Sequence, residues 1–368
     1  MSNWRIVAGA AACVLALTAA STATTASAGP SGGQASAAGH HLRDARTAAR
    51  CAAISNPYGT AKSRLRTCGY TIYPLRRVIP NSDGSTTYLY NVGGHKVTSV
   101  APPPGFDPLK ATNRQLASYG LPTRGALGAR AWHNLMSHFS YAVPHSYLVA
   151  GPATMRFASN CSFCWSGYQD QKHSDYFEAI ASYNEPHTTA GSCSAPRLEG
   201  IWVGVGDEKS TIGQSGTTAG SVHNHQSFWE VIGPNFAGPP MFGRRAKVGD
   251  KITAFTTYPS GEGAYTFTVM DKSKVILQNN FFTSVYQGNF ALFIVEDPQL
   301  GKTHPHIPAF GKITFTNARA ARINGHLARI GSFPHKKLTM TNKAHRPMAP
   351  TSKLTNNNKF TVTYRRCS

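Results

Sequence analysis

The chain has 368 residues, which is enough for one large domain or two moderate ones with a sizeable buried core. It carries 37 Lys and Arg against 16 Asp and Glu, a net charge of +21 at pH 7. This surplus suits anionic partners, either nucleic acid or the anionic polymers of cell walls. The basic residues are scattered and no nucleic-acid-binding motif accompanies them. We therefore expect solvated surface charge and no nucleic-acid partner, with cell-wall polymers as the remaining anionic partner.

The first 28 residues have the pattern of a secretory signal peptide. Arg5 supplies the positive charge, residues 6–19 form the apolar segment, and Ala26-Ser27-Ala28 is a small-residue cleavage site. No later stretch reaches the roughly 18 consecutive apolar residues of a membrane-spanning helix. We expect a secreted, extracellular protein, cleaved after Ala28, that does not bind a membrane.

Residues 29–155, called the leader below, are expected to form a small mixed α/β region that resembles a propeptide. Residues 1–159 hold 15 Lys and Arg but only three acids. The composition predicts a flexible start, a helix over 45–66, and strands over 70–73 and 86–92 with the turn 81–84 between them. We expect the leader to be removed or displaced before the protein acts.

Six cysteines follow the signal peptide, and an even number in an exported protein favours disulfides. Cys161 and Cys164 also have the spacing of a redox or zinc motif, but no second pair or βαβ pattern accompanies them. We expect Cys51 and Cys68 to pair within the leader. The other four, Cys161, Cys164, Cys193 and Cys367, are expected to pair among themselves.

Residues 160–368, called the strand-rich half below, consist of short β-type runs separated by Gly, Pro, Asn and Ser. No helical segment lies between them, which predicts an all-β fold, either an antiparallel β-sandwich or a barrel. The predicted strands cover 177–183, 200–205, 227–232, 251–258, 264–270, 274–277, 290–295, 311–316 and 360–364.

Two of these runs carry polar groups where burial makes them costly. The apolar run 289–295 ends at Glu296, and Trp202-Val203-Gly204-Val205 leads through an acidic turn to Gln214-Ser215-Gly216. Together with Cys164-Trp165-Ser166-Gly167-Tyr168 and Ser227-Phe228-Trp229-Glu230, these motifs resemble those of the glutamic peptidases and follow one another along the chain in the same order as in that family. This family, also called eqolisins, comprises secreted acid endopeptidases. The resemblance spans residues 164–320 and extends to the strand near Tyr364.

The resemblance implies a fold of two large bent antiparallel sheets, a sandwich of the concanavalin-like or jelly-roll type. It also implies a cleft in which Gln214 and Glu296 are catalytic, acting on protein or peptide substrates without a metal or cofactor. The chemistry is self-consistent: a carboxylate can take a proton from the attacking water and return it to the leaving amine. An amide can donate a hydrogen bond to the developing oxyanion. We expect the enzyme to act as a monomer.

Five further residues are candidates for supporting or substrate-binding roles. By the same resemblance, Trp202 matches a tryptophan at the cleft and Glu230 matches a carboxylate beneath it, with a core aromatic as the alternative for Trp202. Phe228 and Trp229, together with Trp202, are expected as stacking surfaces if the sandwich binds polysaccharide or peptide. Gly206 stands where the family has Asp, and Asp207 is expected to take that role. Leu292 also departs from the family, in which many members have Glu at this position.

Other interpretations of the chain remain open. Tyr119-Gly120-Leu121-Pro122 followed by Trp132 resembles an element of bacterial eqolisin leaders, and it also fits a helix that ends at a capping Gly. The pairs His223/His225 and His304/His306 have spacings that allow metal binding, with surface loops as the alternative. The alternative function is a catalytically silent sandwich that binds polysaccharide or peptide in the same cleft.

Overall fold

The computed structural model describes residues 46–47, 50–51, 53–153, 155–157, 163–171, 175–194, 196–207, 211–233, 236–258, 262–300, 304–323 and 327–367. All of them belong to one compact unit, Arg46–Ser368. The expected signal peptide, its cleavage site and the start of the leader lie outside the described residues. Within the described ranges, no helix is long and apolar enough to cross a membrane.

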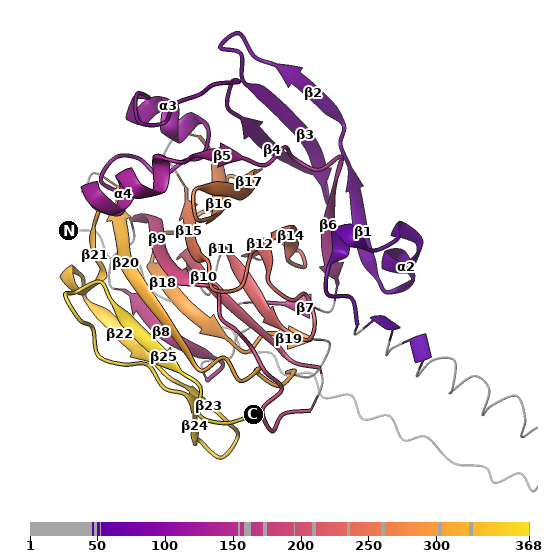
Figure 1. Ribbon diagram of the computed structural model, residues 1–368, viewed down its shortest axis with the longest axis vertical. Helices are drawn as coiled ribbons and strands as arrows, with labels where there is room; N and C mark the ends of the chain where they lie inside the picture. The colour runs from indigo at the N-terminus through magenta and orange to yellow at the C-terminus, as the bar shows by residue number, and fades with distance from the viewer. Residues whose placement is uncertain are drawn as a thin grey trace, which may run out of the picture. The chain divides into compact units, whose positions relative to one another are not determined.

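The fold is an all-β sandwich of two large sheets, almost entirely antiparallel (Figure 1). Sheet A has the strand order β1-β6-β14-β12-β11-β10-β18-β8-β22, with β13 beside β12. Its strands are β1 (Tyr70–Pro74), β6 (Tyr147–Pro152), β14 (Met241–Arg245), β12 (Gln226–Gly233), β11 (Ile212–Gly220), β10 (Leu198–Gly206), β18 (Phe290–Glu296), β8 (Trp165–Asp170), β22 (His335–Leu338) and β13 (Phe236–Ala237).

Sheet B has the order β2-β3-β4-β17-β16-β15-β9-β20-β21, with β25 beside β20 and β5 beside β17. Its strands are β2 (Arg77–Pro80), β3 (Thr86–Val92), β4 (His95–Ala101), β17 (Lys274–Phe282), β16 (Ala264–Asp271), β15 (Lys251–Thr257), β9 (Tyr176–Asn184), β20 (Lys312–Arg322), β21 (Ala328–Arg329), β25 (Phe360–Thr363) and β5 (Ser140–Tyr141). The remaining elements are two short ladders, β7 (Met155–Arg156) with β19 (Gln299–Leu300) and β23 (Met340–Thr341) with β24 (Pro347–Ala349), the helices α2 (Lys62–Thr67), α3 (Asn113–Ser118) and α4 (Ala129–Met136), and the 3-10 turns η1 (Pro57–Gly59) and η2 (Ile330–Ser332).

The main core lies between the two sheets and follows from the period-2 alternation of the strands. On β10, Ile201, Val203 and Val205 point into this core, whereas Leu198 and Trp202 belong to an apolar cluster on the opposite face of sheet A. Burying each such side chain contributes roughly 1.5–3 kcal/mol. Both faces of β10 are therefore covered, which explains why its sequence is apolar at almost every position.

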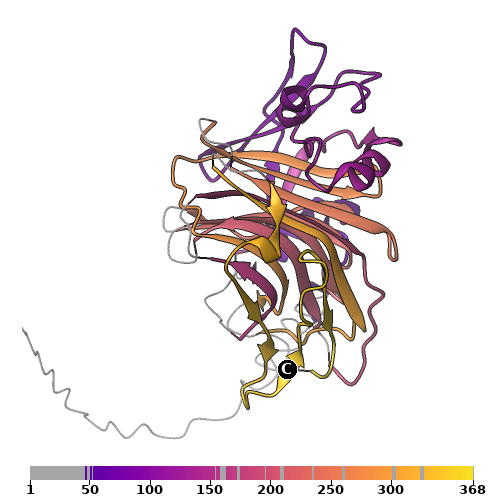
Figure 2. The ribbon, with the colours of Figure 1, turned by 90° about the vertical axis from the view of Figure 1, so that its left-hand side faces the viewer.

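The leader extends both sheets. Its β6 pairs with β14 through Ala150–Met241 and Val149–Phe242, and its β4 pairs with β17 through Thr98–Asn280 and Val97–Phe281. In Figure 1 the leader runs from α4 at the upper left, across the top of the sheets, to β1, β6 and α2 at the right, and Figure 2 shows its helices and hairpin at the top of the sandwich. The contacts are short ladders plus apolar packing, because Tyr90, Val97 and Leu148 join the main core.

Local details of the leader differ from the sequence-based expectations. The helix expected over 45–66 is interrupted, because Pro57 opens a single 3-10 turn and α2 begins only at Lys62. The strand over 70–74 pairs with β6 rather than with 86–92, and the turn at 81–84 joins β2 to β3. Gly120, with φ +67°, follows α3 as a helix-ending glycine, and Trp132 on α4 donates its Nε1 hydrogen to the Pro122 carbonyl at 2.8 Å.

The disulfides follow the expected partition as far as the described residues show it. Cys51 pairs with Cys68 inside the leader, which confirms that prediction, and Cys193 pairs with Cys367 inside the strand-rich half. Cys164 is also disulfide-bonded. Cys161 lies outside the described residues.

Candidate active site

The candidate site lies on the face of sheet A that points away from sheet B, across β12, β11, β10 and β18. The ladder pairs Gln214 with Glu230 and with Gly204, and it pairs Gly200 with Glu296. Gln214 and Glu296 therefore lie on the two strands that flank β10. Gly200, Trp202 and Gly204 lie on one face of β10, because residues two apart on a strand share a face. Gln214 and Glu296 are the ladder partners of Gly204 and Gly200, so both lie on this same face.

Trp202 reaches from one of these residues towards the other. It has glycine on both sides along its face of β10, and a Cβ added to Gly200 or Gly204 would lie 3.3 Å from its indole ring in either case. The same added Cβ on Gly204 would lie 3.2 Å from Gln214 Cβ. At the other end of the ring, Nε1 donates a hydrogen bond to Glu296 Oε2 at 2.8 Å. The indole lies flat because two glycines leave room for it.

Gln214 is held by a second hydrogen bond on the same face. Its Nε2 donates to Glu230 Oε2 at 2.9 Å, and the backbone N–H of Phe157 donates to the same oxygen at 3.0 Å. The carboxylate thereby orients the amide, because only its NH₂ end can donate. Both Gln214 and Glu230 are 0% exposed.

Phe228 lies on the same face and its ring stacks on that of Phe157 with centroids 4.4 Å apart. Trp229 does not lie there. It points into the core between the sheets and stacks on Phe267 at 5.2 Å. The expectation that Trp229 contributes to the site is wrong, because adjacent side chains on a strand alternate and Phe228 and Glu230 occupy the site face.

Asp207 is also placed away from Glu296. It follows the end of β10 and accepts a hydrogen bond from the Asn289 side chain. Glu296 pairs with Gly200, seven residues earlier, which corresponds to roughly 20 Å along the strand. The structure thus brings together Trp202, Gln214, Phe228, Glu230 and Glu296, and it separates Asp207 and Trp229 from them.

Two participants carry little signal in the sequence. Phe157 belongs to the segment that links the leader to the strand-rich half, and only the fold places it at the site. Gly200 has no side chain, and a Cβ at this position would lie 2.7 Å from the ring of Phe157.

The histidines of the pair His223/His225 are engaged by other side chains. His223 is buried, bonds to Tyr70 Oη at 3.0 Å and stacks on Phe242, whereas His225 Nδ1 lies 2.7 Å from Glu185 Oε1. Among the residues that are described, no group of three or more His, Cys, Asp or Glu side chains is arranged to hold a metal ion.

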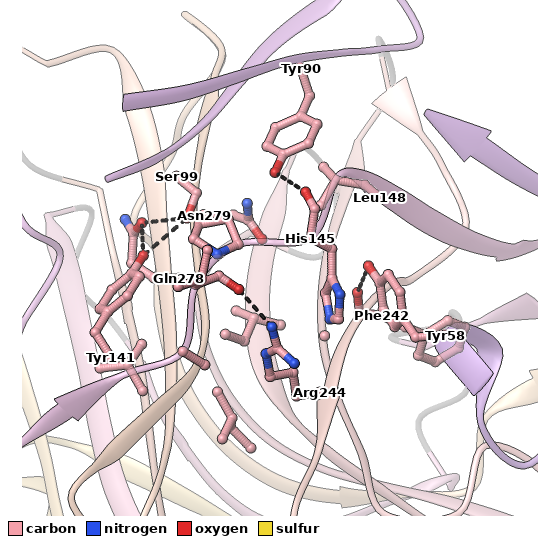
Figure 3. A pocket seen from close by; sticks show the side chains of 17 residues that line it. Tyr58, Tyr90, Ser99, Tyr141, His145, Leu148, Phe242, Arg244, Gln278 and Asn279 are labelled. Atoms are coloured by element: carbon pink, nitrogen blue, oxygen red, sulfur yellow. Dashed lines mark hydrogen bonds between the residues drawn. The ribbon is translucent and has the colours of Figure 1, made fainter. Parts of the chain in front are cut away.

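A separate cavity lies where the leader meets the sandwich (Figure 3). Tyr58 Oη donates to the Phe242 carbonyl at 2.9 Å and stacks on His145 at 3.6 Å. Tyr90 Oη donates to the His145 carbonyl at 2.7 Å, and Arg244 Nη2 donates to the Val143 carbonyl at 2.6 Å. The bonds of Tyr58 and Arg244 join the leader to β14, and Phe242 on this strand pairs with Phe228 of the site face.

Comparison with known proteins identifies the family of the chain. The model of the Peptidase A4 family matches residues 164–364, which are 201 of the 368 residues. The chain belongs to the Peptidase A4 family. It is a peptidase of the glutamic type, and peptides are the substrates of this family.

The Peptidase A4 chain is also similar to solved structures. Scytalido-glutamic peptidase, solved with a transition state analog inhibitor, is 16% identical with a TM-score of 0.46, over 55% of this chain and 98% of that one. SCP-B, a member of the eqolisin family solved with the tripeptide Ala-Ile-His, is 16% identical with a TM-score of 0.43 over the same shares. No curated protein matches the chain.

Proposed function

We propose that this Peptidase A4 member is a secreted endopeptidase in which Glu296 and Gln214 activate water for attack on a peptide bond, at acidic pH. The observation that carries the proposal is that both residues lie on one face of sheet A. Trp202 packs beside Gln214 and hydrogen-bonds Glu296 there.

Each group has a definite task in this mechanism. Glu296, as the carboxylate, takes a proton from water as the water attacks the substrate carbonyl, and then delivers it to the leaving amine. Gln214 cannot transfer protons, and its amide stabilises the oxyanion. Glu230 accepts from Gln214 Nε2 and so fixes the direction of that amide.

Buried acids elsewhere in the fold support operation at acidic pH. Burial raises the pKa of Glu178 to about 7, and burial raises the pKa of Glu199 and of Asp170 well above the usual range. A fold with several carboxyl groups in apolar surroundings is favoured where these groups are protonated, which is at low pH.

We also propose that the leader masks the site until it is displaced. Trp202, Gln214, Glu230 and Glu296 are all 0% exposed in this chain. The apolar cluster that covers their face includes residues that precede the strand-rich half, namely Ile54, Leu65, Tyr70, Val149, Met155 and Phe157. A substrate therefore needs this cover to move. The proposal is excluded if a protein that begins at Gly29 cleaves peptides without any further cut while the leader residues of this apolar cluster remain packed over the site.

The test of the catalytic assignment is Glu296→Gln, which keeps the shape of the side chain and removes the base. We expect kcat/KM for peptide cleavage to fall on the order of 10²–10⁴. Glu178→Gln is the matched control, because it is the same change at a buried acid on sheet B and should leave the rate unchanged. If a folded Glu296→Gln protein cleaves at the parent rate, the assignment is wrong and the silent binding module becomes the better interpretation.

A further inference from the structure

The segment Met155–Phe157 lies on the site face in the manner of a bound peptide. Met155 and Arg156 form β7, which among the described strands pairs with the two-residue strand β19 and with no strand of the large sheets. The next backbone N–H, that of Phe157, donates to Glu230 Oε2, the oxygen that also holds Gln214. An extended segment whose main chain hydrogen-bonds the protein while one side chain is seated in a pocket is a common form of a bound peptide.

The ring of Phe157 fills a definite recess. It stacks on Phe228 with an interplanar angle of 23° and is 0% exposed. A Cβ added to Gly200 would come within 2.7 Å of two atoms of this ring, and within 3.3 Å of Trp202 Cδ1. Phe228 thus forms one wall of the recess. The opposite side has room for the Phe157 ring because residue 200 is glycine and has no Cβ.

We propose that this recess is the specificity subsite of the enzyme and that it takes a large aromatic side chain of the substrate, with Phe157 occupying it in the uncut chain. The inference rests on the proposed function, because it concerns substrates of the same site. It places the selected residue beside Gly200, the residue that pairs with Glu296. The substrates are therefore peptides with Phe or Tyr at one fixed position near the scissile bond.

Glycine at position 200 gives a sharp test. Gly200 lies within the β10 ladder and does not have a positive φ, so alanine fits the backbone there. We expect the active form recovered from the full chain to cleave peptides with Phe or Tyr at this position roughly tenfold to a hundredfold better, in kcat/KM, than peptides with Ala. Gly200→Ala should abolish most of this preference while peptides with Ala are still cleaved.

A control separates the subsite from general loosening of the sandwich. Phe228→Leu should lower the aromatic preference, whereas Phe267→Leu, the same change in the core between the sheets, should leave it unchanged. Cleavage without aromatic preference, or an unchanged preference in Gly200→Ala, would overturn the subsite and leave the peptidase function standing. Absence of any cleavage would instead count against the proposed function.

A binding experiment tests the subsite without relying on activity. Phe157→Ala in the full chain leaves a buried cavity of the shape of the lost ring, and toluene, which has that ring and no backbone, should bind this variant at least about tenfold more tightly than the parent chain in calorimetry. The additional change Gly200→Val should remove this difference. Equal binding of toluene by the Phe157→Ala chain and the parent chain would overturn the proposal, whatever the kinetics show.

Discussion

The indole Nε1 of Trp202 donates a hydrogen bond to Oε2 of Glu296 at 2.8 Å, and both side chains are 0% exposed. The bond fixes the direction of the carboxylate in a site from which water is excluded in this chain. In such surroundings a hydrogen bond to a charged group is worth more than at the surface. Trp202 is therefore placed to position the proposed base as well as to shape the cleft.

We expect Trp202→Phe to lower kcat roughly tenfold to a hundredfold, because the ring is kept and a hydrogen bond to the carboxylate is lost. KM should change much less, since the apolar surface over Gly200 and Gly204 remains. Steady-state kinetics on one peptide, with thermal unfolding as the check on folding, measure both. A variant in which KM rises and kcat is unchanged would show that Trp202 contacts substrate and does not position Glu296.

Gln214→Ala removes the proposed oxyanion donor. We expect kcat to fall by about 10²–10³, the usual loss for one such donor. Because Glu230 then loses the partner at 2.9 Å, the variant should also be less stable. The comparison with Glu230→Gln separates the two effects, since this change keeps Gln214 and disturbs only its orientation. If Glu230→Gln lowers kcat as much as Gln214→Ala does, the presence of the Gln214 amide is not sufficient, and its orientation by Glu230 accounts for the whole effect.

The sandwich and its strands could be predicted because they depend on local patterns. Short runs bounded by Gly, Pro and Asn become strands, and the apolar stretch before Glu296 is β18. The position of Trp229 also follows from a local pattern: side chains alternate along a strand, so a site face that includes Glu230 excludes the adjacent Trp229. Asp207 could not be placed in this way, since only the register of β10 with β18 shows how far it lies from Glu296.

The contribution of the leader could not be predicted, because it rests on contacts between residues far apart in the chain. Nothing near Val149 predicts its pairing with Phe242, and nothing near Phe157 predicts a ring seated on Phe228. The motifs that carry the resemblance of the strand-rich half begin at Cys164, and the leader element Tyr119–Trp132 gives no register with the site, so neither predicts what covers the site. A residue such as Gly200 becomes informative only when its neighbours in space are known.

The stability of the fold should depend on pH through its buried acids. The pKa of Glu178 is raised to about 7 by burial, so the folded state holds a proton there that the unfolded state releases above pH 4.5. Stability from this group is therefore present at low pH and declines as pH rises from about 4.5 to about 7, by roughly 3 kcal/mol. Glu178→Gln should flatten this part of the curve.

Urea unfolding from pH 4 to pH 8 checks this expectation, with Glu296→Gln as the parent protein so that self-digestion does not interfere. The difference in unfolding free energy between parent and Glu178→Gln should change steadily between pH 4.5 and pH 7 and be constant above pH 7. A difference that is the same at every pH would show that Glu178 does not titrate in this range.

Acid should also loosen the leader through two histidines at its contact with the sandwich. Burial, with a smaller effect of Arg244, lowers the pKa of His145 to about 4, and burial lowers that of His223, which bonds Tyr70, to about 3. A histidine whose pKa is lowered when the leader is docked contributes its full stability above about pH 6.5, where it is neutral in both states. This stability is lost as the pH falls towards the pKa of the docked state, because the released state then binds a proton more readily. By pH 4 the loss is roughly 3 kcal/mol for each histidine.

His145→Phe tests this because phenylalanine keeps the stack on Tyr58 and cannot take up a proton. We expect the purified variant to be processed several-fold more slowly than the wild type at pH 4.5 and at the same rate at pH 7, measured by the loss of the intact chain. His138, an exposed leader histidine, provides the control, since His138→Phe should leave both rates unchanged. Equal rates for His145→Phe and wild type at pH 4.5 would show that His145 has no part in the release. The pH dependence would then have to come from His223, which can be examined in the same way with His223→Gln, where the amide still bonds to Tyr70 and does not titrate.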